Sequence, residues 1–414
     1  MIICIDLKSF YASVECVLRG LNPFTVNLVV ADKERGPGSV VLAASPHLKK
    51  FGVQSRCRIY QLPKNLDIIY AKPRMKKYIE YATKIYDIYL KYVSYEDIHV
   101  YSIDEVFIDL GPYLKYYGKS AFEISKMIID DIYKTTKIPA VCGIGENMFL
   151  AKVALDILAK HADDGIAYLD KELLKEKIWP HEPITDIWGI GKNISKRLLK
   201  LGIKNLGDLA KINPQILEDE FGIVGKELYE HAYGIERTTV QDARTYLPTN
   251  KSFGFGQVLF ADYNFQDLYV VLVEMVDQLA CELVMRKLNC GLISLHIGYS
   301  KEVDGGFTKQ KSLPVQTNSR KVLIDEFSKL YYDNVKDLPI RRIDIRVGKL
   351  TNEEFIQVDI FTDYEKIKKE HALYEAIGEI KEKYGKGAVY LAASKLDKAT
   401  FTQRNKLIGG HNAE

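Results

Sequence analysis

The sequence has few cysteines, no long apolar run and almost no excess of either charge. Its 6 cysteines are scattered, and neither a C-x-x-C pair nor a Cys/His cluster occurs. A disulfide framework and a zinc site are therefore not expected, and reduced thiols are the default of the cytoplasm. No window reaches the ~18 apolar residues of a membrane span, and the apolar run at the N-terminus is too short for a signal peptide. We expect a cytoplasmic protein without a membrane partner.

The near balance of charge excludes one class of nucleic-acid binder. Lys and Arg number 58 and Asp and Glu 55, which gives a formal net charge of +3. A histone-like protein that is basic over its whole surface is therefore not expected. Local basic patches are not excluded, because the electrostatic field at a cleft depends on where the charges lie.

The chain changes character several times along its 414 residues. At roughly 100–200 residues per domain, this length suggests about two to four domains. Strands alternate with helices over residues 1–170, which predicts an α/β domain, and residues 23–71 look like an insertion within it. Residues 171–238 read as short helices with glycines between them. After a polar connector, residues 251–350 predict an α+β domain, and a charged tail with helical potential follows.

Carboxylates stand within apolar, strand-like stretches at two places. Asp6 ends the apolar run that opens the chain, and Asp104 and Glu105 interrupt the strand predicted at 99–110. An unpaired buried carboxylate costs several kcal/mol by rough estimate, so the group needs compensation. Mg²⁺ prefers carboxylates plus phosphate oxygens, and two such ions about 3.5–4 Å apart support phosphoryl transfer. The alternative is that Asp6 caps the helix after Ser9 and that Asp104 and Glu105 form a polar hairpin turn.

A Gly-x-Gly turn precedes a basic helix in the middle of the chain. Gly189 and Gly191 flank Ile190, and an amphipathic stretch follows at 194–199. Backbone N–H groups at such a turn can bind a DNA phosphate. The alternative is an ordinary helical hairpin with a solvated basic face. The cations that would add charge are Lys192, Lys196, Arg197, Lys200 and Lys204.

Four segments stand in order along the chain. They are Asp6-Leu7-Lys8-Ser9-Phe10-Tyr11-Ala12-Ser13-Val14-Glu15; Tyr101-Ser102-Ile103-Asp104-Glu105; Gly143-Ile144-Gly145-Glu146-Asn147 with Leu150-Ala151-Lys152; and Trp188-Gly189-Ile190-Gly191. In this order they resemble the first motif, the S-I-D-E motif, the G-I-(G/S)-x-N…A-K segment and the thumb signature of the Y-family DNA polymerases, over about residues 1–350. The resemblance is to the UmuC-like branch of that family, of bacterial, phage or plasmid origin.

The resemblance implies a right-hand polymerase, a multidomain α/β and α+β fold. Asp6, Asp104 and Glu105 would be the catalytic metal ligands, with Leu7 adding its backbone carbonyl. The implied parts are a palm at 1–22 and 72–170, fingers at 23–71, a helix-hairpin-helix thumb at 171–238, a linker at 239–250, a little finger at 251–350 and a C-terminal tail at 351–414.

The resemblance also implies a nucleotide site. Phe10 and Tyr11 would contact the nucleotide, with Tyr11 as the steric gate that crowds a ribose 2′-hydroxyl. Lys49 and Lys160 would contact the triphosphate. The alternatives are a helix tyrosine packed in the core and ordinary surface lysines.

Two residues depart from the family pattern. Lys8 stands where some relatives carry another acid, and Pro46 stands where many carry a tyrosine near the triphosphate. Neither departure removes a catalytic carboxylate, but the second puts the tyrosine contact in doubt.

A segment after residue 350 resembles the Q-L-x-L-F peptides with which bacterial polymerases bind the sliding clamp. Gln357 can hydrogen-bond at the rim of a pocket, and Ile360 and Phe361 offer apolar anchors. Tethering of this kind raises the effective concentration of a polymerase at the primer end. The alternative is a last strand of the preceding domain, because residues 355–361 alternate between apolar and polar.

The sequence thus predicts a DNA-templated DNA polymerase for low-fidelity translesion synthesis, with two Mg²⁺ ions, dNTPs and primer-template DNA. A sliding clamp and SOS accessory proteins are the further partners considered. One rival is a non-catalytic DNA-binding relative, which a primer-extension assay would distinguish. The other is a palm-fold nucleotidyl cyclase, in which the helix-hairpin-helix and the domain after residue 250 would have no role; a DNA-retardation assay would distinguish it.

Overall fold

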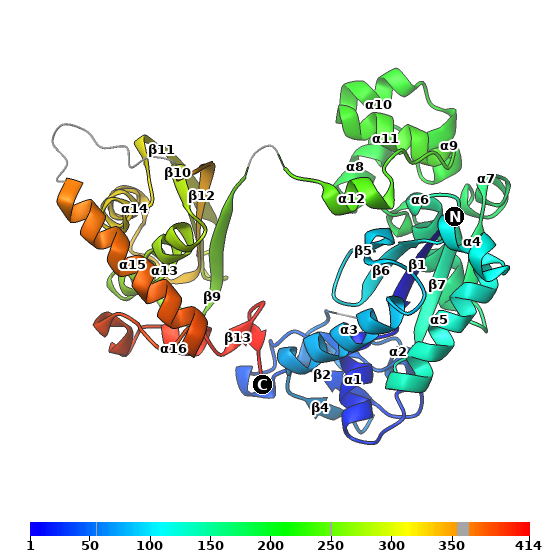
Figure 1. Ribbon diagram of the computed structural model, residues 1–414, viewed down its shortest axis with the longest axis horizontal. Coiled ribbons are helices and arrows are strands. Elements are labelled where there is room, and N and C mark those ends of the chain that lie inside the picture. The colour runs from blue at the N-terminus through cyan, green and yellow to red at the C-terminus, as the bar shows by residue number, and fades with distance from the viewer. Residues whose placement is uncertain (55, 249–250, 354–363) are drawn as a thin grey trace. The chain divides into compact units, whose positions relative to one another are not determined.

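The computed structural model describes residues 1–54, 56–248, 251–353 and 364–414 (Figure 1). The chain divides into two compact units, Met1–Tyr246 together with Glu414, and Leu247–Ala413. Each unit is described by itself below. No helix within these ranges is both long and apolar enough to cross a membrane.

A five-stranded sheet forms the centre of the first unit. Its order is β5-β6-β1-β7-β8, and every neighbouring pair is antiparallel except β7 and β8. The apolar run that opens the chain becomes the buried middle strand. The α/β prediction for this part of the chain is confirmed. The strands are β1 (Ile2–Leu7), β5 (Ile98–Val100), β6 (Glu105–Asp109), β7 (Ala140–Gly145) and β8 (Ile166–Leu169).

A helical run that starts with α6 (Met148–Val153) lies directly on this sheet. The Asn147 side chain caps it by accepting from the Leu150 N–H at 2.9 Å. Close approach to β7 requires Gly143, since a Cβ there would stand 2.1 Å from the Ala151 carbonyl oxygen. Gly145 has the same role, because its Cβ would stand 2.5 Å from the Ala151 nitrogen. The glycines of this motif therefore serve to bring α6 onto the sheet.

Further helices complete the first unit around the sheet. α3 packs on α1 and α5, and α5 packs on β7. α5 begins with a capping box in which Ser120 and Glu123 exchange side-chain and backbone hydrogen bonds. The helices are α1 (Phe10–Leu18), α3 (Met75–Tyr89), α4 (Gly111–Tyr117) and α5 (Ala121–Thr136).

The segment predicted as fingers has a small sheet and core of its own. Its strand order is β3-β2-β4, and Val29, Val41, Ala44 and Leu48 belong to its buried cluster. The elements are β2 (Leu28–Val30), β3 (Ala43–Ala44), α2 (Pro46–Lys49) and β4 (Ile69–Ala71). Pro46 fits the first position of α2, where a backbone N–H has no partner within the helix.

The segment predicted as thumb is helical throughout, as expected. Its apolar side chains, among them Leu198, Leu209, Leu217 and Leu228, form one buried cluster that also includes Phe149 of α6. The helices are α7 (Lys171–Leu173), α8 (Lys192–Lys200), α9 (Leu206–Lys211), α10 (Pro214–Phe221) and α11 (Ile223–Ala232).

The structure differs from the linker prediction in its first half. Residues 239–250 were expected to be a polar connector, but α12 (Val240–Thr245) forms there behind a capping box of Thr239 and Asp242. Val240 is buried beside Phe107. The Arg244 guanidinium lies 4.7 Å from the centroid of the Tyr95 ring. This half of the segment is therefore part of the first unit.

The second unit is a four-stranded antiparallel sheet covered by two helices, which agrees with the α+β prediction. The strand order is β11-β10-β12-β9. Both α13 and α14 pack on it, with Met275 and Phe327 fully buried between the layers. The elements are β9 (Phe253–Tyr263), α13 (Phe265–Met285), β10 (Leu288–Tyr299), β11 (Gly306–Thr317), α14 (Arg320–Asn334) and β12 (Ile340–Asn352).

The C-terminal segment folds onto α13. Helix α15 (Tyr364–Tyr384) packs along it, and the Tyr374 hydroxyl donates to Asp277, which also accepts from Arg320 Nε at 2.7 Å. Near α16 (Phe401–Arg404), the Thr400 N–H donates to the buried Glu274 carboxylate at 2.9 Å. A short hairpin, β13 (Leu407–Ile408) and β14 (His411–Asn412), follows. Residues 364–413 thus belong to the second unit and are not a separate tail.

Candidate active site

Asp104 and Glu105 lie at the turn between the two strands of a hairpin. The prediction of a single strand over 99–110 is therefore wrong. β5 and β6 pair antiparallel, with Ile98 opposite Ile108. The Ser102 hydroxyl donates to Asp104 Oδ1 at 2.6 Å. Asp104 is therefore in the polar turn that was considered as the alternative, while Glu105 is the first, buried residue of β6.

Strand register brings the third carboxylate to the same place. Asp6 is the cross-strand partner of Glu105 between β1 and β6, so the two side chains stand on the same face of the sheet. The Leu7 N–H donates to the Asp104 carbonyl oxygen at 2.9 Å, which ties the turn to the end of β1. The structure thus gathers the three carboxylates that the sequence pattern singled out.

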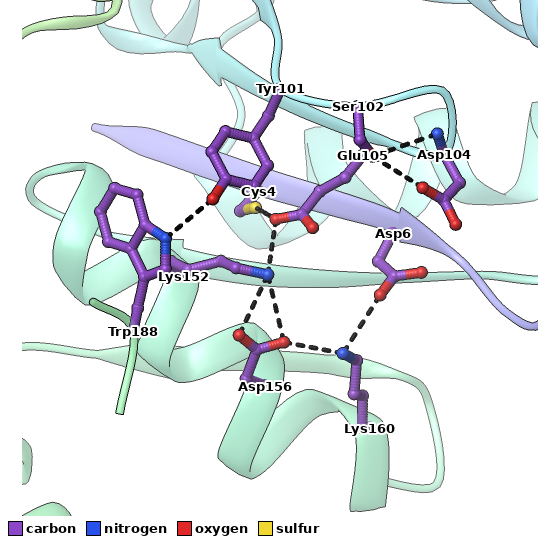
Figure 2. A network of polar contacts seen from close by, with 10 residues as sticks. All are labelled: Cys4, Asp6, Tyr101, Ser102, Asp104, Glu105, Lys152, Asp156, Lys160 and Trp188. Atoms are coloured by element: carbon purple, nitrogen blue, oxygen red, sulfur yellow. Dashed lines mark hydrogen bonds and ion pairs between the residues drawn. The ribbon is translucent and has the colours of Figure 1, made fainter. Parts of the chain in front are cut away.

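A buried lysine balances the charge of Glu105. Lys152 Nζ lies 2.6 Å from Glu105 Oε1, and the Cys4 thiol donates to the same oxygen at 3.1 Å (Figure 2). Burial and the Glu105 carboxylate raise the pKa of the Cys4 thiol well above its usual range. The thiol therefore stays protonated and serves as a donor.

Asp156 links this lysine to a second one. After α6 the helical run widens into a π-helical turn at Ala154–Leu158, a distortion often found at functional sites. Asp156 Oδ2 lies 3.0 Å from Lys152 Nζ, and Asp156 Oδ1 lies 2.7 Å from Lys160 Nζ. Lys160 Nζ also lies 3.1 Å from Asp6 Oδ2. A chain of alternating charges therefore runs from Glu105 to Asp6, as Figure 2 shows.

The charges in this chain depend on one another. Burial raises the pKa of the Asp6 carboxyl, Lys160 opposes the rise, and Asp104 adds to it. Burial alone would lower the pKa of the Lys160 ammonium, but the carboxylates of Asp6 and Asp156 raise it above its usual value. Lys160 thus favours the ionised form of Asp6, and the two carboxylates favour the ionised form of Lys160.

Each of the three carboxylates keeps one oxygen for a ligand. The engaged atoms are Glu105 Oε1, Asp104 Oδ1 and Asp6 Oδ2; their companion oxygens have no hydrogen bond or ion pair with the protein within the described ranges. Hard oxygen donors of this kind suit Mg²⁺, so the donor set fits a divalent ion. Within those same ranges, however, no three His, Cys, Asp or Glu side chains are already gathered around one point as metal ligands. Two of the carboxylates instead form ion pairs with lysines: Glu105 with Lys152, and Asp6 with Lys160.

Tyr11 lies beside the carboxylates and stacks on a buried tyrosine. The ring centroids of Tyr11 and Tyr78 are 4.4 Å apart at 15°, and the Tyr78 hydroxyl donates to Glu15 Oε1 at 2.8 Å. Burial raises the pKa of the Tyr11 hydroxyl, and the Asp104 carboxylate adds to the rise, so the two groups lie within electrostatic reach. Phe10 is buried in the core, so only its backbone could contact a nucleotide.

Two more lysines act on the site. Removal from water lowers the pKa of the Lys49 ammonium, while the Asp6 carboxylate raises it; Lys160 and Asp104 are also within reach. Lys8 shows the same pattern, with burial as the main cause and Asp6 as the opposing one. The sequence pattern named Lys49 and Lys160 but gave no role to Lys8, Lys152, Asp156 or Cys4. The i, i+4 spacing of 152, 156 and 160 was the available signal.

Comparison with known proteins identifies the family. The impB/mucB/samB family matches residues 5–156, its C-terminal domain matches residues 250–360, and the thumb domain of DNA polymerase-iota matches residues 185–236. The putative UV-damage repair protein UvrX of Bacillus subtilis (strain 168) is 34% identical over 100% of this chain and 97% of its own. The chain belongs to the Y family of DNA polymerases. It is a DNA-directed DNA polymerase of the kind that serves damage tolerance, and its family depends on divalent metal ions.

Other relatives agree with this assignment. DNA polymerase IV 2 of the same Bacillus strain is 31% identical over 99% of this chain and 98% of its own. The fold is similar to that of the Y-family DNA polymerase chimera Dbh-Dpo4(243-245)-Dbh, with a TM-score of 0.66 over 85% of this chain and 99% of that one, at 23% identity. The right-hand polymerase fold expected from the sequence is confirmed.

The thumb of the polymerase carries the predicted Gly-x-Gly turn. Gly189 has a positive φ of 88°, which suits glycine, and Gly191 is the N-cap of α8. Lys192 and Lys196 are exposed on α8. Arg197 is engaged within the thumb: its Nε lies 2.7 Å from Glu220 Oε1, and its guanidinium lies 4.2 Å from the Phe221 ring centroid. The two neighbouring cations of α8 are therefore not equivalent.

We expect Lys196→Ala and Arg197→Ala to affect DNA binding differently. Loss of one phosphate contact at Lys196 should make the log–log salt slope of duplex binding shallower by roughly 0.9. Arg197→Ala should leave the slope nearly unchanged and lower the melting temperature, because it breaks the contact between α8 and α10. Fluorescence anisotropy over a salt series measures the slope. An unaltered slope in Lys196→Ala would favour the alternative, in which the basic face of α8 is solvated and does not contact DNA.

The predicted clamp-binding residues Gln357, Ile360 and Phe361 lie outside the described residues. The structure therefore decides neither for the clamp peptide nor for the alternative of a last strand. Strand β12 itself ends at Asn352.

Proposed function

We propose that this polymerase copies damaged templates with low fidelity, using two Mg²⁺ ions at Asp6, Asp104 and Glu105. The observation that carries the proposal is the meeting of these carboxylates at the ends of β1 and β6, each with one oxygen left for a ligand. Bound there, the two ions would supply Lewis-acid activation of the primer 3′-hydroxyl and charge stabilisation at the leaving group. The backbone carbonyl of Leu7 is proposed as a further ligand.

Residues of the chain itself account for binding of the dNTP. Lys160 is 38% exposed and can turn from Asp6 to the triphosphate, and Lys49 lies within reach of the same acids. No side chain caps the first turn of α1, so the N–H groups near Phe10 can donate to phosphate oxygens. The ring of Tyr11 would stand against the 2′ position of the sugar.

The reaction joins the primer to the nucleotide in one displacement. The primer 3′-oxygen loses its proton and forms a bond to the α-phosphorus of the dNTP. The bond from that phosphorus to the α,β-bridging oxygen breaks, and pyrophosphate leaves with the bonding electrons. Positioning and charge stabilisation account for most of the catalysis in such a transfer.

The damaged template is the finer part of the proposal. It is supported by the similarity to UvrX, a putative UV-damage repair protein. We expect primer extension through a cyclobutane thymine dimer under conditions in which a replicative polymerase stops before the dimer. Single-nucleotide kinetics opposite the dimer and opposite undamaged thymines measure the effect. Arrest before the dimer, with normal extension on undamaged template, would contradict lesion bypass and leave the polymerase assignment intact.

The partners beyond DNA and dNTP rest on the sequence alone. A sliding clamp at Gln357, Ile360 and Phe361 and accessory proteins of the SOS response remain predictions. No contact within the described ranges bears on them.

A further inference from the structure

Lys152 is a buried cation between two acids. Its side chain is only 8% exposed, and its Nζ lies 2.6 Å from Glu105 Oε1 and 3.0 Å from Asp156 Oδ2. Burial alone would lower the pKa of this ammonium, but the Glu105 and Asp156 carboxylates raise it well above its usual range. Lys152 therefore stays positively charged and balances the charge of the buried Glu105 carboxylate.

Both protein contacts to Glu105 use the same oxygen. Lys152 and the Cys4 thiol meet at Oε1, and no contact to Oε2 occurs within the described ranges. Figure 2 shows the carboxylate approached from the side of Cys4 and Lys152. The arrangement fixes the rotation of the carboxylate and leaves its second oxygen for a ligand.

The two lysines of the helical run differ in their freedom. The Lys160 side chain is 38% exposed against 8% for Lys152, and it contacts Asp6 at the longer distance of 3.1 Å. Lys160 can therefore leave for a phosphate, while Lys152 stays. The charges that act on one another here are balanced, because four carboxylates face four lysines: Asp6, Asp104, Glu105 and Asp156 against Lys8, Lys49, Lys152 and Lys160.

We propose that Lys152, anchored by Asp156, is a positioning residue that orients Glu105 and supplies a fixed positive charge, which weakens metal binding until the nucleotide arrives. This inference rests on the proposed two-metal function. Without a triphosphate the site is neutral and attracts divalent ions weakly. The incoming triphosphate adds negative charge and draws Lys160 away from Asp6, and both changes favour metal binding. Lys152 thereby makes metal binding depend on the dNTP, which matters for a polymerase whose acids would otherwise hold metal without substrate.

The test compares metal binding with and without nucleotide, in the absence of turnover. Free Mn²⁺ is measured by electron paramagnetic resonance on the full chain with primer-template DNA ending in a dideoxynucleotide. Lys152→Met keeps an unbranched side chain, one heavy atom shorter, and removes its charge. The matched control is Lys126→Met, because Lys126 and Asp130 form an i, i+4 pair at 2.8 Å on the exposed face of α5.

We expect Lys152→Met to bind Mn²⁺ roughly tenfold more tightly than wild type without dNTP, since loss of a unit charge a few ångströms away has at least this effect. The gain in affinity on adding dNTP should shrink by the same factor. At saturating metal, kcat should fall while the KM for dNTP changes little, because Glu105 loses its orientation. The control should match wild type in every measurement.

Asp156→Asn should act in the opposite direction and keeps the inference testable if Lys152→Met folds poorly. Losing this carboxylate leaves both lysines more firmly on Glu105 and Asp6, so Mn²⁺ affinity without dNTP should fall. The KM for dNTP should rise, because Lys160 is held more firmly by Asp6 and is less available to the triphosphate. A merely structural role would lower the melting temperature in both variants and would not move metal affinity in opposite directions.

Two failures are distinguishable. If wild type binds no Mn²⁺ even with dNTP, the proposed two-metal function is wrong. If wild type binds Mn²⁺ with dNTP but a folded Lys152→Met or Asp156→Asn shows wild-type affinities, only the inference about Lys152 is overturned.

Discussion

Asp104→Asn is expected to abolish nucleotide incorporation and to leave DNA binding within a few-fold of wild type. The amide oxygen of asparagine can still accept from the Ser102 hydroxyl, as Asp104 Oδ1 does at 2.6 Å. The backbone contact from Leu7 to the Asp104 carbonyl is also retained. What is lost is the second oxygen and its charge. Removal of one neutral donor that stabilises transition-state charge already costs roughly 10²–10³-fold in kcat, so loss of a metal-binding carboxylate should cost at least as much.

The control for this variant lies at the far end of β6, the strand that begins directly after Asp104. Asp109 ends β6 opposite Ile2, and Asp109→Asn makes the same chemical change away from the site. Single-turnover primer extension measures incorporation, and fluorescence anisotropy measures DNA affinity. Incorporation within a few-fold of wild type in Asp104→Asn would refute the assignment of Asp104 as a metal ligand, and with it the proposed mechanism.

The order of elements in the first unit could be predicted because it rests on local pattern. The apolar run before Asp6 forms β1, and the helical spacing of apolar residues over 76–92 forms α3. The error at 99–110 has a local cause. Residues on both sides of the turn favour strands, and only the polar Ser102 and Asp104 mark the point where the chain reverses. In the second unit, β11 is an edge strand with a polar sequence, so local pattern marks it only weakly.

The charge balance of the site could not be predicted from the carboxylates alone. Buried acids need compensation of their charge, and from the sequence a metal ion is the expected source of it. The structure supplies Lys152 and Lys160 first, because Gly143 and Gly145 allow α6 to lie on β7. Which residues a helix presents to a sheet depends on that close approach. The regular spacing of the lysines is visible in the sequence, but their acidic partners across the sheet are not.

The segments after each domain were also judged from composition. Residues 239–250 and 351–414 are polar and charged, which is typical of connectors, yet α12 packs on the first unit and α15 on α13. In both, a few side chains decide the outcome. Val240 is buried beside Phe107, and Tyr374 reaches the buried Asp277. Such single contacts between distant segments are long-range and leave little trace in local pattern.

Tyr11→Ala is expected to open the nucleotide site to ribonucleotides. The ring is held in place by stacking at 4.4 Å on Tyr78. Tyr78 is fully buried, and its hydroxyl is fixed by Glu15, which also accepts from Arg74 Nε at 3.0 Å. A ring with such support cannot turn aside for a 2′-hydroxyl. Its removal should lower discrimination, the ratio of kcat/KM for dNTP to that for rNTP, by roughly 10²–10³-fold, or about 3–4 kcal/mol at 1.36 kcal/mol per factor of ten.

The supporting tyrosine provides a graded control for this prediction. Tyr78→Phe keeps the ring on which Tyr11 stacks and removes only the hydroxyl, which donates to Glu15 and accepts from the Arg74 N–H at 3.2 Å. Discrimination should therefore change little in Tyr78→Phe. In Tyr11→Ala, most of the change should come from faster rNTP use, because a deoxynucleotide has no 2′-hydroxyl for the ring to exclude. Steady-state kinetics with one dNTP and its matching rNTP measure both ratios. If Tyr11→Ala keeps the wild-type ratio, the ring is a packing element of α1, and another part of the site must exclude the 2′-hydroxyl.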